Sequence, residues 1–358
     1  MKKEKRIKKG RDRVLHTESL RKFRAWVFMI LAFCISPSAW GQTDDRAKQV
    51  EAAKKEGKLI WYTSANVTES KPLLDDFEKQ YPFIKGEIFR ASGEKVLNRT
   101  LTETRAGRWD FDVITINEVH ELMDAKLLAP YRSPEAKNFI ADFKDPNDYW
   151  SAVYVVYRTI GYNTRLLAEK DVPKQWEDLL DAKWRGKISI DPEEYNWYST
   201  LVKSWGKERT QKYMRALAKQ EIQWRKGHTL IAQLTSAGEF PLGLIYVHRI
   251  EEMKQRGAPI DWVNTVNPVV VTLNAAGLSP KPPHPNAARL FIDFLLSKPG
   301  QQRLRALRRI PARSDIETLS PRLEQSKLKL AIQPRETGTQ YREAVKRFPR
   351  NFRVVIGQ

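Results

Sequence analysis

The sequence predicts an α/β fold of two lobes, each a mostly parallel sheet flanked by helices and joined to the other by β crossings. Three observations support this class. Strand-then-helix units follow one another early in the chain, a second α/β block comes later, and two long apolar β runs separate the blocks. A length of 358 residues with a hydrophobic fraction of 41% is enough for two compact cores.

The first block contains three successive β–α units, which favour a parallel sheet. Short apolar runs bounded by polar residues predict its strands, and apolar side chains at helical spacing predict its helices. In order, the predicted elements are a polar helix at 45–56, a strand at 58–64, a helix at 66–81, a strand at 84–91, a helix through 97–104, a strand at 111–116 and a short helix from 117.

The second block lies between two β runs, at 150–163 and 267–277, which we take as the crossings. The block itself is predicted to contain a helix at 175–182, a strand at 187–191, helices within 194–218, a strand at 222–225, a helix at 228–237, a strand at 241–246 and a helix at 248–256. Two further helices are expected at 287–296 and 300–307. The resulting division is lobe 1 at 42–155 with 268–330, lobe 2 at 156–267, and a basic tail at 331–358.

The net charge of +20 is concentrated at the two ends of the chain. Residues 1–41 carry +8 and residues 300–358 carry +9, whereas residues 42–299 carry only +3. A strong basic excess raises the question of nucleic acid or an anionic membrane as a partner. The balanced middle argues against nucleic acid. The basic C-terminal end fits either anionic lipid headgroups or a solvated helical face.

Residues 1–41 have the pattern of a secretory signal peptide. A long basic stretch precedes the apolar run 25–35, which is too short to span a bilayer, and small residues at Ala39 and Gly41 suit cleavage before Gln42. We therefore expect a periplasmic protein, the alternatives being an uncleaved anchor or a lipoprotein acylated at Cys34. Because Cys34 is the chain's single cysteine, the mature chain would have no disulfide, thiolate metal site or catalytic cysteine.

Motifs for catalysis are sparse. The chain has no Gly-x-Ser-x-Gly elbow, phosphate-binding loop, dinucleotide fingerprint or His-Glu-x-x-His motif. Glu118, His120 and Glu121 could ligate a metal, but on a helix these positions face different sides, which favours a solvated surface. We expect no enzyme activity and no cofactor. A periplasmic enzyme on a two-lobe scaffold remains the competing class.

Polar side chains follow the ends of the predicted strands. In open α/β sheets ligands bind beyond the carboxyl ends of the strands, at helix N-termini that favour anions. The expected ligand-binding residues are Ser64, Asn66, Ser92, Gly93, Asn117, Tyr195, Tyr198, Arg225, Tyr246 and His248. The alternative for any single residue is helix capping, which also selects Ser and Asn.

Arginines and aromatic side chains in the same regions suggest what the ligand is. Arg90, Arg225 and Arg249 could hold a carboxylate, phosphonate or phosphate through paired hydrogen bonds. An organic moiety could stack on aromatic walls, or these rings could instead pack in the lobe cores. The aromatic residues concerned are Tyr154, Tyr157, Tyr195, Trp197 and Tyr246.

Several segments together resemble the solute-binding proteins of bacterial ABC importers, in the branch of ferric-iron, thiamine and polyamine binders. They are 59–64, 111–113, 161–164 with its Tyr-Asn-Thr, 173–188 with Trp-Glu-Asp-Leu-Leu, and 291–301. The resemblance runs from about 45 to 315. It implies the two-lobe periplasmic-binding-protein fold, type II, and hinge closure on a small solute that passes to an inner-membrane permease and its ATPase. We expect a monomer.

The resemblance also raises ferric iron as an alternative solute. The ferric branch binds iron through a histidine, a glutamate and two adjacent tyrosines, and these positions fall near Asn66, Asn117, His248 and Arg249. Amides and an arginine suit a highly charged ferric ion poorly. A small organic ion is therefore the preferred solute. If iron is bound, the candidate ligands are Tyr195, Tyr246 and His248.

Overall fold

A computed structural model describes residues 38–332, 343 and 346–348, without the side chains of 38–44 and 325. The chain divides into two units, 1–51 and 52–358. The predicted polar helix is α2, Ser38–Glu56, which ends where expected and begins seven residues earlier. The apolar run of the predicted signal peptide and Cys34 lie outside the described residues. Among the helices that are described, none has the length and apolar character needed to cross a membrane.

The strands of the second unit form one continuous sheet. Its described order is β2-β1-β3-β9-β4-β7-β5-β6, with β8 and β10 also paired to β4 and β11 paired to β9. The strands are β1 Lys58–Thr63, β2 Lys85–Arg90, β3 Val113–Ile116, β4 Ser151–Asn163, β5 Ile188–Ile190, β6 Gln223–Trp224, β7 Leu242–Tyr246, β8 Ile260–Trp262, β9 Val269–Leu278, β10 Ile310–Pro311 and β11 Leu330–Ile332.

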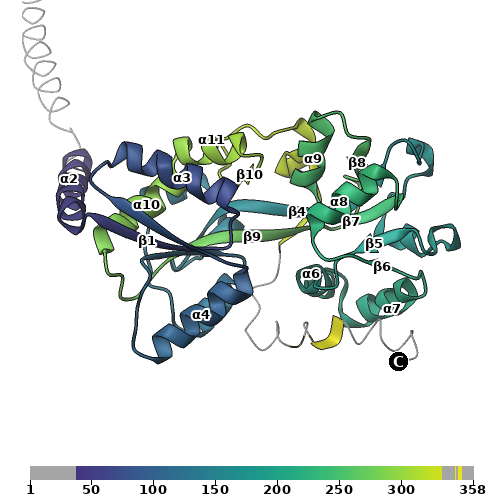
Figure 1. Ribbon diagram of the computed structural model, residues 1–358, viewed down its shortest axis with the longest axis horizontal. Helices are drawn as coiled ribbons and strands as arrows, with labels where there is room; N and C mark the ends of the chain where they lie inside the picture. Colours follow the sequence, from purple (N-terminus) through teal and green to yellow (C-terminus); the bar gives the residue numbers. More distant parts are fainter. Residues whose placement is uncertain (1–37, 333–342, 344–345, 349–358) are drawn as a thin grey trace, which may run out of the picture. The chain divides into compact units, whose positions relative to one another are not determined.

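Helices cover both faces of this sheet. In Figure 1, α3 and α10 lie on one face beside β1, and α4 lies on the other. The α-helices that begin in the second unit are α3 Val67–Gln80, α4 Gly93–Arg105, α5 Val119–Asp124, α6 Tyr195–Trp205, α7 Lys207–Ala218, α8 His228–Ala237, α9 Val247–Gln255, α10 Pro285–Leu296 and α11 Lys298–Ala306. Their apolar stripes face the sheet; in α3 the buried residues include Leu73, Leu74 and Phe77.

Parallel pairs lie at the two ends of the sheet and antiparallel pairs join them, while β11 runs parallel to the central strand β9. β1 runs parallel to β2 and β3, and β5 runs parallel to β6 and β7. Between these groups, β9 pairs antiparallel with β3 and β4, and β4 pairs antiparallel with β7. The two long β runs predicted as crossings are therefore neighbouring central strands. The carboxyl ends of β1, β3, β5 and β7 each lead into a helix N-terminus or a turn that precedes one.

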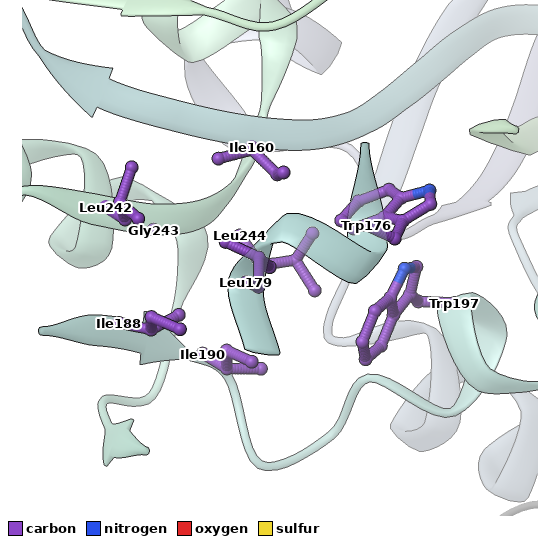
Figure 2. A pocket seen from close by; sticks show the side chains of 9 residues that line it. All are labelled: Ile160, Trp176, Leu179, Ile188, Ile190, Trp197, Leu242, Gly243 and Leu244. Carbon is purple, nitrogen blue, oxygen red and sulfur yellow. The ribbon is translucent and has the colours of Figure 1, made fainter. Parts of the chain in front are cut away.

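The core of the β5–β7 half is closely packed. Figure 2 shows apolar side chains converging on a cavity of about 10 Å³. They come from β4, β5, β7, α6 and the turn that contains Trp176 and Leu179. Trp197 is fully buried there, its ring 5.4 Å from that of Trp176. Such a small apolar space has no room or polar partners for a water molecule. Trp197 is thus part of the core and not of an aromatic ligand wall.

Two local predictions differ from the structure. The helix expected at 175–182 is a pair of short 3₁₀ turns, Trp176–Leu180 and Ala182–Trp184. The indole of Trp176 donates to the carbonyl of Pro268, a long-range contact that local helical periodicity does not contain. The strands β8, β10 and β11, of two or three residues each, were not predicted.

Leu242→Ala should lower the free energy of unfolding by about 2–5 kcal/mol, because it leaves a cavity in this core. Urea denaturation measures the change. Leu230→Ala is the matched control. Leu230 lies on α8, beside β7, and is 41% exposed, so the substitution should lower the free energy of unfolding by no more than about 0.5 kcal/mol. Equal losses in the two variants would contradict the packing.

Candidate functional site

Polar side chains from the β1–β3 end of the sheet gather around Asn274 of β9. Its amide Nδ2 donates to Ser64 Oγ at 3.2 Å and to Asn117 Oδ1 at 3.1 Å. Nearby, Arg90 Nη2 donates to Asn66 Oδ1 at 2.8 Å. Within the described residues Arg90 bonds only uncharged oxygens, so its positive charge is available to an anion.

Ser92 and Gly93 begin α4. The Ser92 hydroxyl accepts from the backbone N–H of Lys95 at 3.4 Å, so this serine is a helix cap. Gly93 faces the Glu118 carboxylate: a Cβ at Gly93 would come within 2.0 Å of Glu118 Oε2. Burial raises the pKa of the Glu118 carboxyl, and the charge of Glu94 adds to the effect. From the sequence, Glu118 was expected to lie on a solvated surface, with a metal ligand as the alternative.

Arg158 is the centre of a buried ion network on the other side of β9. Its Nε lies 3.0 Å from Glu194 Oε2, and its Nη2 donates to the Tyr246 hydroxyl at 3.0 Å. It also donates to the hydroxyl of Thr272. Both charged side chains are buried, Arg158 to 4% and Glu194 to 1% exposure. Burial by itself would raise the pKa of Glu194, but Arg158 and His228 outweigh it and lower the pKa.

His228 extends this network from the first residue of α8. Its Nε2 lies 3.0 Å from Glu194 Oε1, and its Nδ1 lies 3.3 Å from the carbonyl oxygen of Leu244. Both ring nitrogens therefore face oxygen atoms. The ring stacks on Tyr246 with centroids 3.5 Å apart. Such stacking of aromatic rings is favourable packing.

His248 is held neutral by its surroundings. It is 1% exposed, and burial, together with the nearby charges of Arg309, Arg249 and His228, lowers its pKa well below the usual range. Arg309 Nη1 lies 2.8 Å from His248 Nε2. Since a guanidinium only donates, Nε2 accepts and the imidazole proton sits on Nδ1.

Glu69, in the first turn of α3, joins the two groups of residues. It accepts from the backbone N–H of Asn66 at 3.3 Å and from Arg309 Nη2 at 2.6 Å. Arg249 lies 3.5 Å from the same carboxylate and 3.0 Å from Glu252. The guanidinium of Arg309 lies over the Tyr154 ring at 4.7 Å. The loop after β1 and the start of α9 are therefore brought together.

Several buried polar atoms in this region have no hydrogen-bond partner among the described residues. Among them are Glu118 Oε2, His248 Nδ1 and Asn274 Oδ1. Leaving buried polar groups unpaired is costly, so natural proteins rarely do it without a reason such as a ligand or bound water. His248 Nδ1 is a hydrogen-bond donor, Asn274 Oδ1 is an acceptor, and the Glu118 carboxyl can be either.

Tyr195 and Tyr198 lie in the first turn of α6, which directly follows Glu194. Both contact the ring of Phe348, at centroid distances of 5.9 Å and 6.1 Å. Sequence reasoning had no signal for this contact, because Phe348 is about 150 residues away along the chain. That the two tyrosines contact the ligand stays a prediction.

Arg225 is also separated from the rest. Its guanidinium pairs with Glu239 at 3.2 Å and lies over the ring of Phe240 at 5.1 Å. Phe240 precedes β7, whereas the candidate site lies at the opposite, carboxyl end of that strand. That Arg225 contacts an anionic ligand stays a prediction.

Two of the candidate iron ligands, Tyr246 and His248, lie beside cationic side chains. Tyr246 accepts from Arg158, and burial raises the pKa of its hydroxyl, so it is not poised to ionise. His248 is bonded to Arg309, and Tyr195 lies beside Phe348. In the described part of the chain, histidines, cysteines and carboxylates form no group of three able to hold a metal ion.

A larger hollow of about 600 Å³ lies elsewhere, beside β10 and the segment 310–326. None of the ten predicted ligand-binding residues lines it. The hydroxyl of Tyr157 faces it without a described hydrogen-bond partner, and this tyrosine is fully buried. Tyr157 thus lies away from the candidate site, contrary to the aromatic wall considered from the sequence.

The geometry defines a binding protein: an α/β sheet whose strand ends converge on buried, unpaired polar groups. A family model described as "Bacterial extracellular solute-binding protein" matches residues 73–329. The chain belongs to this family, which confirms the resemblance, the fold class and the solute-binding role expected from the sequence.

Individual relatives agree with this membership. An uncharacterized protein of Haemophilus influenzae is 26% identical, covering 70% of this chain and 76% of the relative. An Fe(3+)-binding periplasmic protein of Serratia marcescens is 21% identical, covering 71% and 78%.

Two solved structures share the fold with TM-scores of 0.72. Iron-bound HitA from Pseudomonas aeruginosa is 20% identical, and AfuA from Actinobacillus pleuropneumoniae, with fructose-6-phosphate bound, is 24% identical. Each match covers 83% of this chain and 99% of the other.

Glu194→Gln should lower the free energy of unfolding at neutral pH by about 3 kcal/mol or more, because it leaves Arg158 buried without its counter-charge. Urea denaturation measures this change. Glu193→Gln is the control, since Glu193 is exposed and its pair with Lys226 is worth at most about 1 kcal/mol. A loss no larger than the control's would show that Glu194 does not stabilise the network.

The difference in stability between wild type and Glu194→Gln should also depend on pH. Because the folded state lowers the pKa of Glu194, its contribution is complete above the unfolded value of about 4.5 and is lost as the pH falls through the folded value. The difference in stability between wild type and Glu194→Gln should therefore narrow below about pH 4.5. A stability difference that widens as the pH falls would contradict a lowered pKa for Glu194.

Proposed function

We propose that this protein is the periplasmic component of an ABC importer, and that it captures a small hydroxylated organic anion and delivers it to an inner-membrane permease. It has no catalytic role in this proposal. Membership in the solute-binding family and the periplasmic names of relatives support the location and the transport role. The solute class is inferred from the candidate site.

One observation carries the solute class: cationic side chains surround buried polar atoms that lack partners. The field of Arg309, Arg249 and His228 contributes to the lowered pKa of His248, so the local charge favours an anion. Arg90 adds a cation with no ion pair among the described residues. Helix N-termini at α3, α4 and α5 supply further N–H groups.

The unpaired atoms indicate that the anion carries hydroxyl groups. A hydroxyl can donate to Asn274 Oδ1 and accept from His248 Nδ1, and it can pair with the Glu118 carboxyl in either protonation state. A hydroxy acid or a phosphorylated polyol combines hydroxyls with an anionic group. The fructose 6-phosphate held by AfuA has this chemistry and serves as a probe.

Ferric iron is the second candidate solute. Relatives named for ferric binding and the neighbouring positions of Tyr246 and His248, with ring centroids 5.7 Å apart, favour it. Arg158 on the Tyr246 hydroxyl and Arg309 on His248 oppose it. Ferric binding with a tyrosinate-to-metal absorption band that disappears in Tyr246→Phe would establish ferric iron as the solute, in place of the organic anion.

A thermal-shift screen of the mature protein tests the solute class, because a ligand that binds the folded state raises the melting temperature. The panel is fructose 6-phosphate, citrate, inorganic phosphate, a polyamine and a ferric salt. We expect a shift with hydroxylated anions and none with the polyamine. A shift with the polyamine alone, or turnover of a probe to product, would contradict the proposal.

Arg90→Gln should weaken binding of the anion that gives the largest shift by about tenfold or more, because it removes a charge-assisted hydrogen bond. Isothermal titration calorimetry measures the affinity. Arg105→Gln is the matched control, an exposed arginine in the last turn of α4. Equal affinities for the two variants would remove Arg90 from the site.

A further inference from the structure

The first turn of α6 and the adjacent β6 present an aromatic surface, formed by Tyr195, Tyr198 and Trp224, which we call the α6 aromatic surface. Phe348 packs on it with ring centroids 5.9, 6.1 and 6.4 Å from the three residues. The rings of Tyr195 and Trp224 meet that of Phe348 nearly edge-on, at 87° and 88°, a favoured aromatic geometry. Phe348 is 1% exposed, so the surface buries its side chain.

Charge complementarity favours the same contact. Burial raises the pKa of Tyr195, and the charges of Glu193, Glu94 and Asp191 raise it further, although Lys226 opposes them. These carboxylates place negative charge around the tyrosine. Residues 331–358 carry a net charge of +4. A basic segment is therefore attracted to the acidic surroundings of the surface that holds its phenylalanine.

The α6 aromatic surface borders the candidate ligand site. Tyr195 directly follows Glu194, the buried partner of Arg158 and His228. Its surroundings also include Glu94 of α4, which begins at the carboxyl end of β2 on the other side of the central strands.

We propose that the C-terminal segment is an intramolecular competitor of the ligand: Phe348 occupies the α6 aromatic surface and must leave it before an organic ligand stacks on Tyr195. The inference rests on the proposed function in one respect, that the ligand uses this surface. When only a fraction of molecules is free to bind, the apparent dissociation constant is the intrinsic one divided by that fraction. Burial of one phenyl ring favours docking by about tenfold or more.

Phe348→Ala in the full-length chain tests docking and competition separately. Trypsin cleaves after Arg347, and a docked Phe348 shields that bond. Cleavage at Arg347, followed by mass spectrometry, should become about tenfold faster in the variant. Glu343→Gln is the matched control: it breaks the exposed pair between Glu343 and Arg347 within the same segment and leaves the ring in place. Equal cleavage rates in wild type and Phe348→Ala would overturn docking.

Calorimetry with fructose 6-phosphate measures competition. Phe348→Ala should bind this probe about tenfold more tightly than wild type, Phe348→Leu should be intermediate, and Glu343→Gln should match wild type. Faster cleavage without tighter binding would overturn competition and leave docking established. If neither wild type nor variant binds the probe, the proposed ligand class fails and competition with it, while the cleavage rates still decide docking.

Discussion

The buried contact between Arg158 and Glu194 is the constraint on which the centre of the protein depends. The guanidinium belongs to β4, and through it and its carboxylate partner the ends of β7, α6 and α8 and the middle of β9 are tied together. Removing two charges from water costs several kcal/mol per ion, and only a complete set of partners compensates. Each contact in the network is therefore conditional on the others. A change at Tyr246 therefore reaches Glu194 through Arg158, and a change at His228 removes a direct partner of Glu194.

The fold was largely readable from the sequence because hydrophobic periodicity reports local structure. Helix α8 coincides with the predicted 228–237, and β4 and β9 follow the predicted β runs within two residues. What periodicity could not supply was structure fixed by distant partners. The two residues of β10 are a strand only because they pair with Tyr154 and Val155, and Trp176 leaves the α-helical pattern in favour of a contact with Pro268.

The candidate site was readable only in part, for a related reason. The rule that ligands lie beyond strand ends identified Ser64 and Asn117, which both accept from Asn274, and His248, which contacts Arg309. It could not find Arg158 or Asn274, because these side chains project from the middle of β4 and β9. Nor could it tell which way a side chain turns. Arg225 follows β6 as expected, yet its guanidinium lies over the ring of Phe240, which precedes β7. Direction and distant pairing are properties of the tertiary structure.

The continuity of the sheet has a mechanical consequence. The parallel strands at the two ends are joined through β9 and β4, whose hydrogen bonds run from Ser151 to Arg158 without a flexible linker between them. Any rotation of one end against the other must twist these two strands, and the register shift between Ala152 and Tyr154 is where the ladder is already irregular. Backbone pairing would therefore resist such a rotation, and the binding free energy of a solute would have to exceed the cost of the twist.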